Sequence, residues 1–133
     1  HANVFGYWYG TSKEFIRSTI AKGHHVIMDI DVQGAIQISE TDFNIIKIFI
    51  LPPSLSVLKQ RLEDRNTDIP EVIEKRLQTA KKEIACLGHY DYLVINEDIE
   101  KAVAEVKDII TAESLRTKRY CDIEKNFYDL EVE

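Results

Sequence analysis

Three short apolar runs, each followed by a helical pattern, constrain the fold of this chain more than any other feature. The runs are His25–Met28, Ile45–Leu51 and Tyr92–Ile95. Runs dominated by apolar residues, without regular alternation with polar ones, are typical of strands buried on both faces. Strands separated by helices favour a parallel sheet, because parallel neighbours need a long crossover connection. The sequence therefore predicts an α/β fold in which helices flank a parallel sheet.

Capping residues and apolar positions spaced three and four apart predict the helices between these strands. Serine, threonine and aspartate favour helix starts, while glycine and proline mark ends and first turns. The chain after Arg119 is mixed and acidic, and we expect it to fray. The predicted helices run from Thr11 to Gly23, from Gly34 to about Ser39, from Ser54 to a break at Asn66–Asp68, from Pro70 to Gly88, and from Asp98 through Ile110.

Length, charge and cysteine content limit the classes of protein to consider. A chain of 133 residues is one domain's worth. A net charge of −6 argues against a nucleic-acid partner. Cys86 and Cys121 have no metal-site or redox spacing, so a reduced, cytoplasmic setting is expected. No apolar run approaches the roughly 20 residues of a membrane span, and we expect no membrane partner.

Two carboxylates, Asp29 and Asp31, stand at the end of the first apolar run, just before the helical pattern at Gly34. They would lie at the carboxyl edge of the sheet, where open α/β sheets bind ligands. Carboxylates there suit a Mg²⁺ ion or the donor-rich edge of a base. The alternative is that they only solvate the strand end and cap the next helix.

Arg61 and Arg65 lie four residues apart on one predicted helix, and Arg76 lies on the next. Three arginines around a break would form a mobile cationic lid over phosphates. The alternative is a solvated charged face, since acidic residues such as Glu63 and Glu74 are interspersed with them. The chain has no Gly-x-x-x-x-Gly-Lys-Ser/Thr loop to cradle phosphates.

Taken together and in this order, the pieces resemble guanylate kinase, the family that moves a phosphoryl group from ATP to GMP. The resemblance implies an α/β fold with a P-loop nucleoside-monophosphate-kinase-like parallel sheet, flanking helices and a helical lid, incomplete at the N-terminus. The matching pieces are Val4–Ser12, Asp29–Gly34, Ile48–Ser54, Arg61–Arg65, Arg76–Leu77 and Tyr90–Asn96.

The resemblance makes residues 1–133 a partial guanylate kinase domain. Residues 1–12 would be the end of the GMP-binding region, 13–60 and 90–120 the core, and 61–89 the lid region. The family's phosphate loop and the rest of its GMP site would lie upstream of His1, and the phosphate-loop strand would lie beside the strand Ile45–Leu51. We therefore expect this chain alone to be inactive, and to close the gap left by that strand, to pair or swap strands with another copy, to aggregate, or to keep the upstream segment as a separate piece.

Carried over residue by residue, the resemblance implies a GMP site and a metal ion. Tyr9, with Gly10, would bind the GMP phosphate, and Thr11 and Asp29 would contact the guanine. The same site would accept dGMP. Asp31 would orient a Mg²⁺ ion, held through water, near the transferring phosphate of ATP.

The resemblance also assigns the basic residues. Arg61, Arg65 and Arg76 would stabilise charge on the migrating phosphoryl group, and Asn96 would lie beside the ATP adenine.

Two other functions stay open at this point. The first is a guanylate-kinase-like scaffold module that binds phosphopeptides without catalysis. Such modules tend to lose the lid arginines and the catalytic acid, which are present here. The second is a related kinase that acts on another phosphorylated metabolite, against which the pair Thr11 and Asp29 favours guanine.

Overall fold

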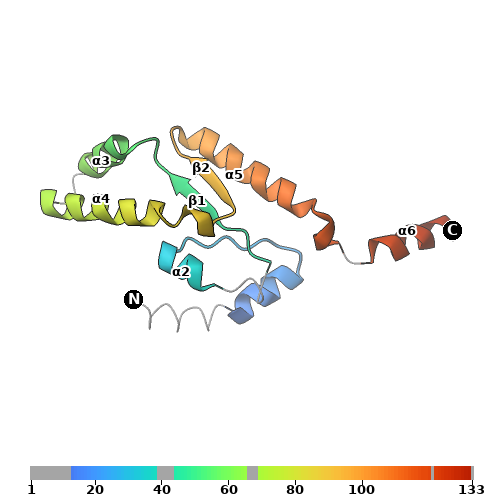
Figure 1. The fold of residues 1–133 in the computed structure, drawn as a ribbon. Coiled ribbons are helices and arrows are strands. Elements are labelled where there is room, and N and C mark those ends of the chain that lie inside the picture. The colour runs from blue at the N-terminus through green and yellow to red at the C-terminus, as the bar shows by residue number, and fades with distance from the viewer. Residues whose placement is uncertain (1–12, 39–43, 66–68, 121, 133) are drawn as a thin grey trace. The chain divides into compact units, whose positions relative to one another are not determined.

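The fold is described from a computed structural model, for residues 13–38, 44–65, 69–120 and 122–132 (Figure 1). The chain divides into two compact units, residues 1–47 and residues 48–133. Each unit is described by itself.

Among its described residues, the first unit contains two helices joined by an extended stretch. A helix over residues 13–21 ends at Gly23, whose φ of 85° is a conformation that glycine adopts without strain. The helix α2 (Val32–Gln37) follows an extended stretch over residues 24–31. Ile16 of the first helix, Ala35 of α2 and Ile38 just after α2 are buried.

The predicted strand at His25–Met28 is wrong for this chain. Residues 24–31 are extended but belong to no strand, and Ile27 is 79% exposed. A strand needs a neighbour for its backbone N–H and C=O groups. None of the described residues of this unit forms such a neighbour.

The second unit holds a parallel two-stranded sheet, β1 (Ile48–Leu51) and β2 (Tyr92–Ile95), in which Ile48 pairs with Tyr92 and Leu51 with Ile95. The connection from β1 to β2 is helical, as predicted for an α/β fold. The remaining elements of this unit are α3 (Leu55–Asp64), α4 (Pro70–Ile84), the short 3₁₀ helix η1 (Leu87–His89), α5 (Ile99–Ser114), the 3₁₀ helix η2 (Thr117–Arg119) and α6 (Ile123–Val132).

The helices α3 and α4, which lie between β1 and β2 in the sequence, pack against each other. Ser54 starts α3 as predicted, because its hydroxyl accepts a hydrogen bond of 3.1 Å from the Val57 N–H. Leu62, Ile73 and Leu77 form a buried cluster, against which Leu58 packs. The helical hairpin therefore has a small core of its own.

Replacing Leu77 with alanine is expected to open this hairpin. The lost apolar contacts and the cavity should destabilise the closed hairpin by about 2–5 kcal/mol. This free energy corresponds to a more than tenfold increase in the equilibrium constant for local opening. Amide hydrogen exchange in α4 should therefore accelerate more than tenfold. Gln78→Ala, at the exposed neighbouring position, is the matched control and should leave the rates almost unchanged. Equal exchange in the two variants would contradict this account of the hairpin core.

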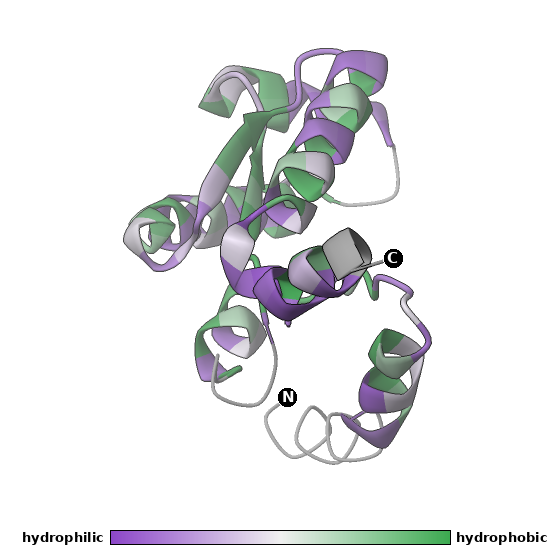
Figure 2. Ribbon diagram, turned by 90° about the vertical axis from the view of Figure 1, so that its right-hand side faces the viewer, coloured by the Kyte–Doolittle hydropathy of each residue, from purple (hydrophilic) through white to green (hydrophobic). Residues whose placement is uncertain are grey.

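The helix α5 covers one face of the sheet. Asp98 caps it through a 3.0 Å bond from the Glu100 N–H, and Val94 of β2 is only 2% exposed. By contrast Ile50, Leu93 and Ile95 stay about half exposed. Figure 2 shows both strands as hydrophobic. The sheet thus presents apolar surface that the described residues do not cover.

The prediction that the chain frays after Arg119 is wrong, since α6 forms there. Asp122 has a φ of 56°, and its carbonyl accepts a 2.9 Å bond from the Asn126 N–H. Glu124 in the first turn favours a helix start through the helix dipole. Ile123 and Phe127 are 60% and 59% exposed.

Among the described residues, no helix is both long and apolar enough to cross a bilayer.

Candidate functional site

The predicted site residues fall in both units, and each half is described within its own unit. Asp29 and Asp31 belong to the first, and the three arginines and Asn96 to the second. Tyr9, Gly10 and Thr11 lie outside the described residues.

Asp31 is the N-cap of α2. Its carboxylate oxygen Oδ1 accepts a 2.8 Å hydrogen bond from the Gly34 N–H, and its carbonyl accepts one of 2.9 Å from the Ala35 N–H. This bears out the capping alternative as a local role. The cap engages one of the two carboxylate oxygens, and both Asp31 and Asp29 are exposed to solvent. Capping therefore leaves Asp31 available to a ligand.

The donor set around Asp31 fits Mg²⁺ bound together with a nucleotide. No group of three or more His, Cys, Asp or Glu side chains gathers anywhere in the described ranges. Mg²⁺ does not need such a cage, because it is usually held by one or two carboxylates, phosphate oxygens and several retained waters. An exposed carboxylate fixed by a helix cap meets this requirement.

Arg61 contacts Glu97, the residue that follows Asn96, at the carboxyl edge of the β1–β2 sheet. Arg61 Nη2 donates to the Glu97 carbonyl oxygen at 3.4 Å, and the Asn96 N–H donates to the Leu51 carbonyl at 2.7 Å. Strand ends of this kind are where open α/β sheets bind ligands. The structure thus brings one predicted lid arginine next to the predicted adenine position. Their roles stay predictions.

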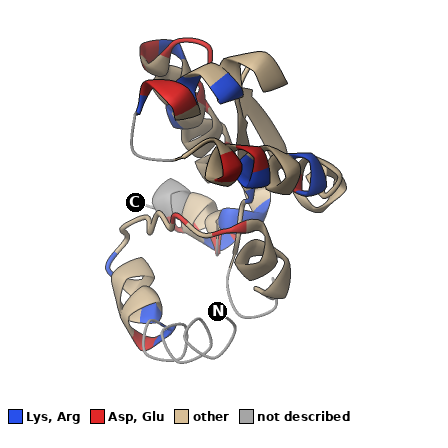
Figure 3. Cartoon of the chain, turned by 90° about the vertical axis from the view of Figure 1, so that its left-hand side faces the viewer, with Lys and Arg blue, Asp and Glu red and all other residues tan. Residues whose placement is uncertain are grey.

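Arg65 and Arg76 are both exposed on the α3–α4 hairpin, Arg65 at the C-cap of α3 and Arg76 within α4. The break predicted between them, residues 66–68, lies outside the described residues. Figure 3 shows basic and acidic residues interspersed on the helices. The three arginines are therefore part of one packed hairpin, on a surface of mixed charge.

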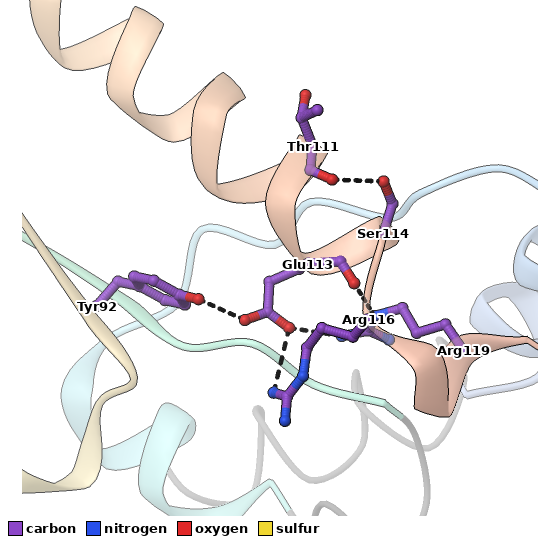
Figure 4. A network of polar contacts seen from close by, with 6 residues as sticks. All are labelled: Tyr92, Thr111, Glu113, Ser114, Arg116 and Arg119. Carbon is purple, nitrogen blue, oxygen red and sulfur yellow. Dashed lines mark hydrogen bonds and ion pairs between the residues drawn. The ribbon is translucent and has the colours of Figure 1, made fainter.

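Sequence reasoning missed a buried carboxylate, Glu113, in the last turn of α5. It is 7% exposed and accepts hydrogen bonds from Tyr92 and Arg119 (Figure 4). The signal was available, because Glu113 continues the apolar stripe of Ile109 and Ile110 at a spacing of four and three. An acid on the buried face of a helix indicates partners from another element.

The family model for guanylate kinase matches residues 1–113. The guanylate kinase of Hahella chejuensis is 52% identical over 116 residues, which are 87% of this chain and 56% of that protein. Those of Carboxydothermus hydrogenoformans (46% identity, 89% and 58%) and Salmonella paratyphi A (48%, 90% and 58%) match similarly.

The chain spans just over half the length of these curated relatives. The family match covers 113 of its 133 residues, from the first residue to the last turn of α5. This confirms the resemblance read from the motifs, and the parallel order of β1 and β2 agrees with the predicted α/β class. The chain belongs to the guanylate kinase family.

Proposed function

We propose that this chain is part of an enzyme that transfers the terminal phosphoryl group of ATP to GMP and dGMP. The products are ADP and GDP or dGDP, and the reaction belongs to purine nucleotide metabolism. The observation that carries the proposal is the family match over residues 1–113. Asp31 and the three lid arginines are present, which favours the kinase over a phosphopeptide-binding module.

In this proposal the first unit binds the acceptor. Tyr9 and Gly10 contact the GMP phosphate, and Thr11 and Asp29 read the guanine. Asp31 holds Mg²⁺ through water, and the ion, when bound, neutralises charge on the phosphates. The Gly34 N–H bond that fixes the Asp31 carboxylate supports this role, since a metal-orienting group must itself be oriented.

The second unit supplies the donor side and the cations. Asn96 lies beside the adenine, at the sheet edge where Arg61 also sits. Arg61, Arg65 and Arg76 stabilise charge on the migrating phosphoryl group, usually the largest effect in this chemistry. The proposed lid region 61–89 contains the end of α3 and the whole of α4. Because the buried cluster of Leu62, Ile73 and Leu77 lies within it, this region suits a lid that moves as a unit.

We also propose a cytoplasmic location and no nucleic-acid or membrane partner. The net charge of −6 and the thiols without redox spacing support this.

The test uses a chimera in which the part of the Hahella chejuensis enzyme upstream of its match is joined to residue 1 of this chain. With ATP and Mg²⁺, kcat/KM for GMP and dGMP should exceed that for AMP by about 10⁴-fold, because a site built to hydrogen-bond guanine leaves buried groups unpaired with adenine. Asp29→Ala should reduce this ratio. Comparable turnover of AMP and GMP by the chimera would overturn the proposed specificity.

A further inference from the structure

Glu113 joins three parts of the second unit at the end of α5 (Figure 4). Its carboxylate oxygen Oε2 accepts a hydrogen bond of 2.5 Å from the hydroxyl of Tyr92 in β2. Its oxygen Oε1 accepts a hydrogen bond of 3.1 Å from Arg119 Nη2 and forms an ion pair of 3.5 Å with Arg116 Nη1. The first residue of β2 and the segment after α5 are thereby held by one side chain.

Arg119 donates two hydrogen bonds to Glu113. Besides the carboxylate contact, its Nε donates to the Glu113 main-chain carbonyl at 2.6 Å. The last carbonyls of a helix lack intrahelical partners, so a guanidinium there caps the helix and complements its dipole. Arg119 is mostly buried, at 20% side-chain exposure, whereas Arg116 is 53% exposed. Arg119 is therefore the principal contact of the pair.

The charges around Glu113 favour its ionised form. The Tyr92 hydrogen bond, followed by Arg119 and Arg116, holds the pKa of Glu113 below its ordinary value, although burial opposes this. In return, the hydrogen bond to Glu113, together with burial and the nearby Asp91, raises the pKa of Tyr92. The groups facing Glu113 are thus a tyrosine from the strand side and two arginines from the segment that follows.

We infer that Glu113 and Arg119 form a clasp that fixes residues 115–120, and with them the start of the C-terminal segment, to the β2–α5 unit. Losing the Glu113 charge opens this clasp while the sheet stays folded. The clasp lies at the far end of β2 from Asn96 and makes no use of the proposed nucleotide site. It is a conformational device that decides whether the C-terminal segment is fixed to the sheet.

Hydrogen exchange by mass spectrometry on the 133-residue chain tests the clasp. In Glu113→Gln, the amides of Arg119 and Tyr120, which bond to the carbonyls of Arg116 and Thr117, should exchange at least about tenfold faster than in the wild type. Exchange in β2 should stay unchanged. Glu124→Gln makes the same chemical change at an exposed acid of α6 and should match the wild type.

Lowering the pH tests the clasp independently of the variants. The depressed pKa means that the clasp is fully closed above the ordinary glutamate pKa of about 4.3 and opens as pH falls through the lower folded value. After correction for intrinsic rates, the wild type should reach the rates of Glu113→Gln over this range, and the variant should show no step.

If Glu113→Gln does not fold, Arg119→Lys serves instead, since lysine keeps the charge but cannot reach the carbonyl and the carboxylate together. It should show the same local loss of protection. The clasp is overturned if Glu113→Gln or Arg119→Lys exchanges like Glu124→Gln at residues 117–120. It is equally overturned if β2 loses protection to the same extent as that segment.

Discussion

The 133-residue chain by itself is expected to show no GMP kinase activity and to be larger than 15.4 kDa in solution. Activity should be absent because the sequence contains no phosphate loop. Association is expected because Ile50, Leu93 and Ile95 expose about half of their apolar surface on a two-stranded sheet. Exposed apolar strands with open edges pair with other chains.

The family resemblance adds an expectation about the open edge of β1. It places the phosphate-loop strand beside β1, where the backbone groups of the two strands would pair. A second copy of the chain would satisfy the same groups by forming a dimer or by swapping a strand. A few unpaired groups at about 1–3 kcal/mol each rival the whole 5–15 kcal/mol stability of a domain.

Light scattering beside a kinase assay tests this expectation. Leu93→Lys places a charge on the exposed sheet and should reduce association, and Lys101→Ala on the exposed surface of α5 is the control. A monodisperse 15.4 kDa monomer that phosphorylates GMP would refute the expectation.

Arg76→Ala in the chimera should lower kcat by about 10²-fold or more while the KM for GMP changes little. An arginine that meets charge developing on the phosphoryl group contributes mainly in the transition state, so its loss appears in kcat. Arg76 is exposed on α4, and its removal leaves the Leu62–Ile73–Leu77 cluster intact. Folding of the hairpin should therefore be preserved.

Lys75→Ala is the matched control, because Lys75 is the neighbouring exposed cation on the same helix. Its kcat should stay near that of the unmodified chimera. If kcat of Arg76→Ala stays within about threefold, which is below 1 kcal/mol of transition-state energy, Arg76 has no place in the lid.

Local chemistry made much of the second unit predictable. Ser54 and Asp98 cap α3 and α5 as expected, and Pro70 begins α4. The strand pair was predictable because runs such as Tyr92–Ile95 have few other stable solutions. In each case the residues that decide the structure are neighbours in the sequence.

The strand prediction that failed depends on a distant partner. Residues 25–28 have a strand's composition, yet a strand exists only beside another, and the first unit offers none among its described residues. In the site, the bond from Arg61 to the Glu97 carbonyl spans 36 positions, and outside the site the Tyr92–Glu113 bond spans 21. Helical spacing placed the arginines on their helices, but it did not say what they touch.

The most direct test of the central account is the kcat of the chimera for GMP with ATP and Mg²⁺. If residues 1–133 supply the acid, the lid arginines and the adenine side of a guanylate kinase, kcat should lie within about tenfold of the Hahella chejuensis enzyme, a difference of roughly 1.4 kcal/mol in the barrier. A folded chimera that turns over GMP no faster than the upstream Hahella segment alone would contradict the account.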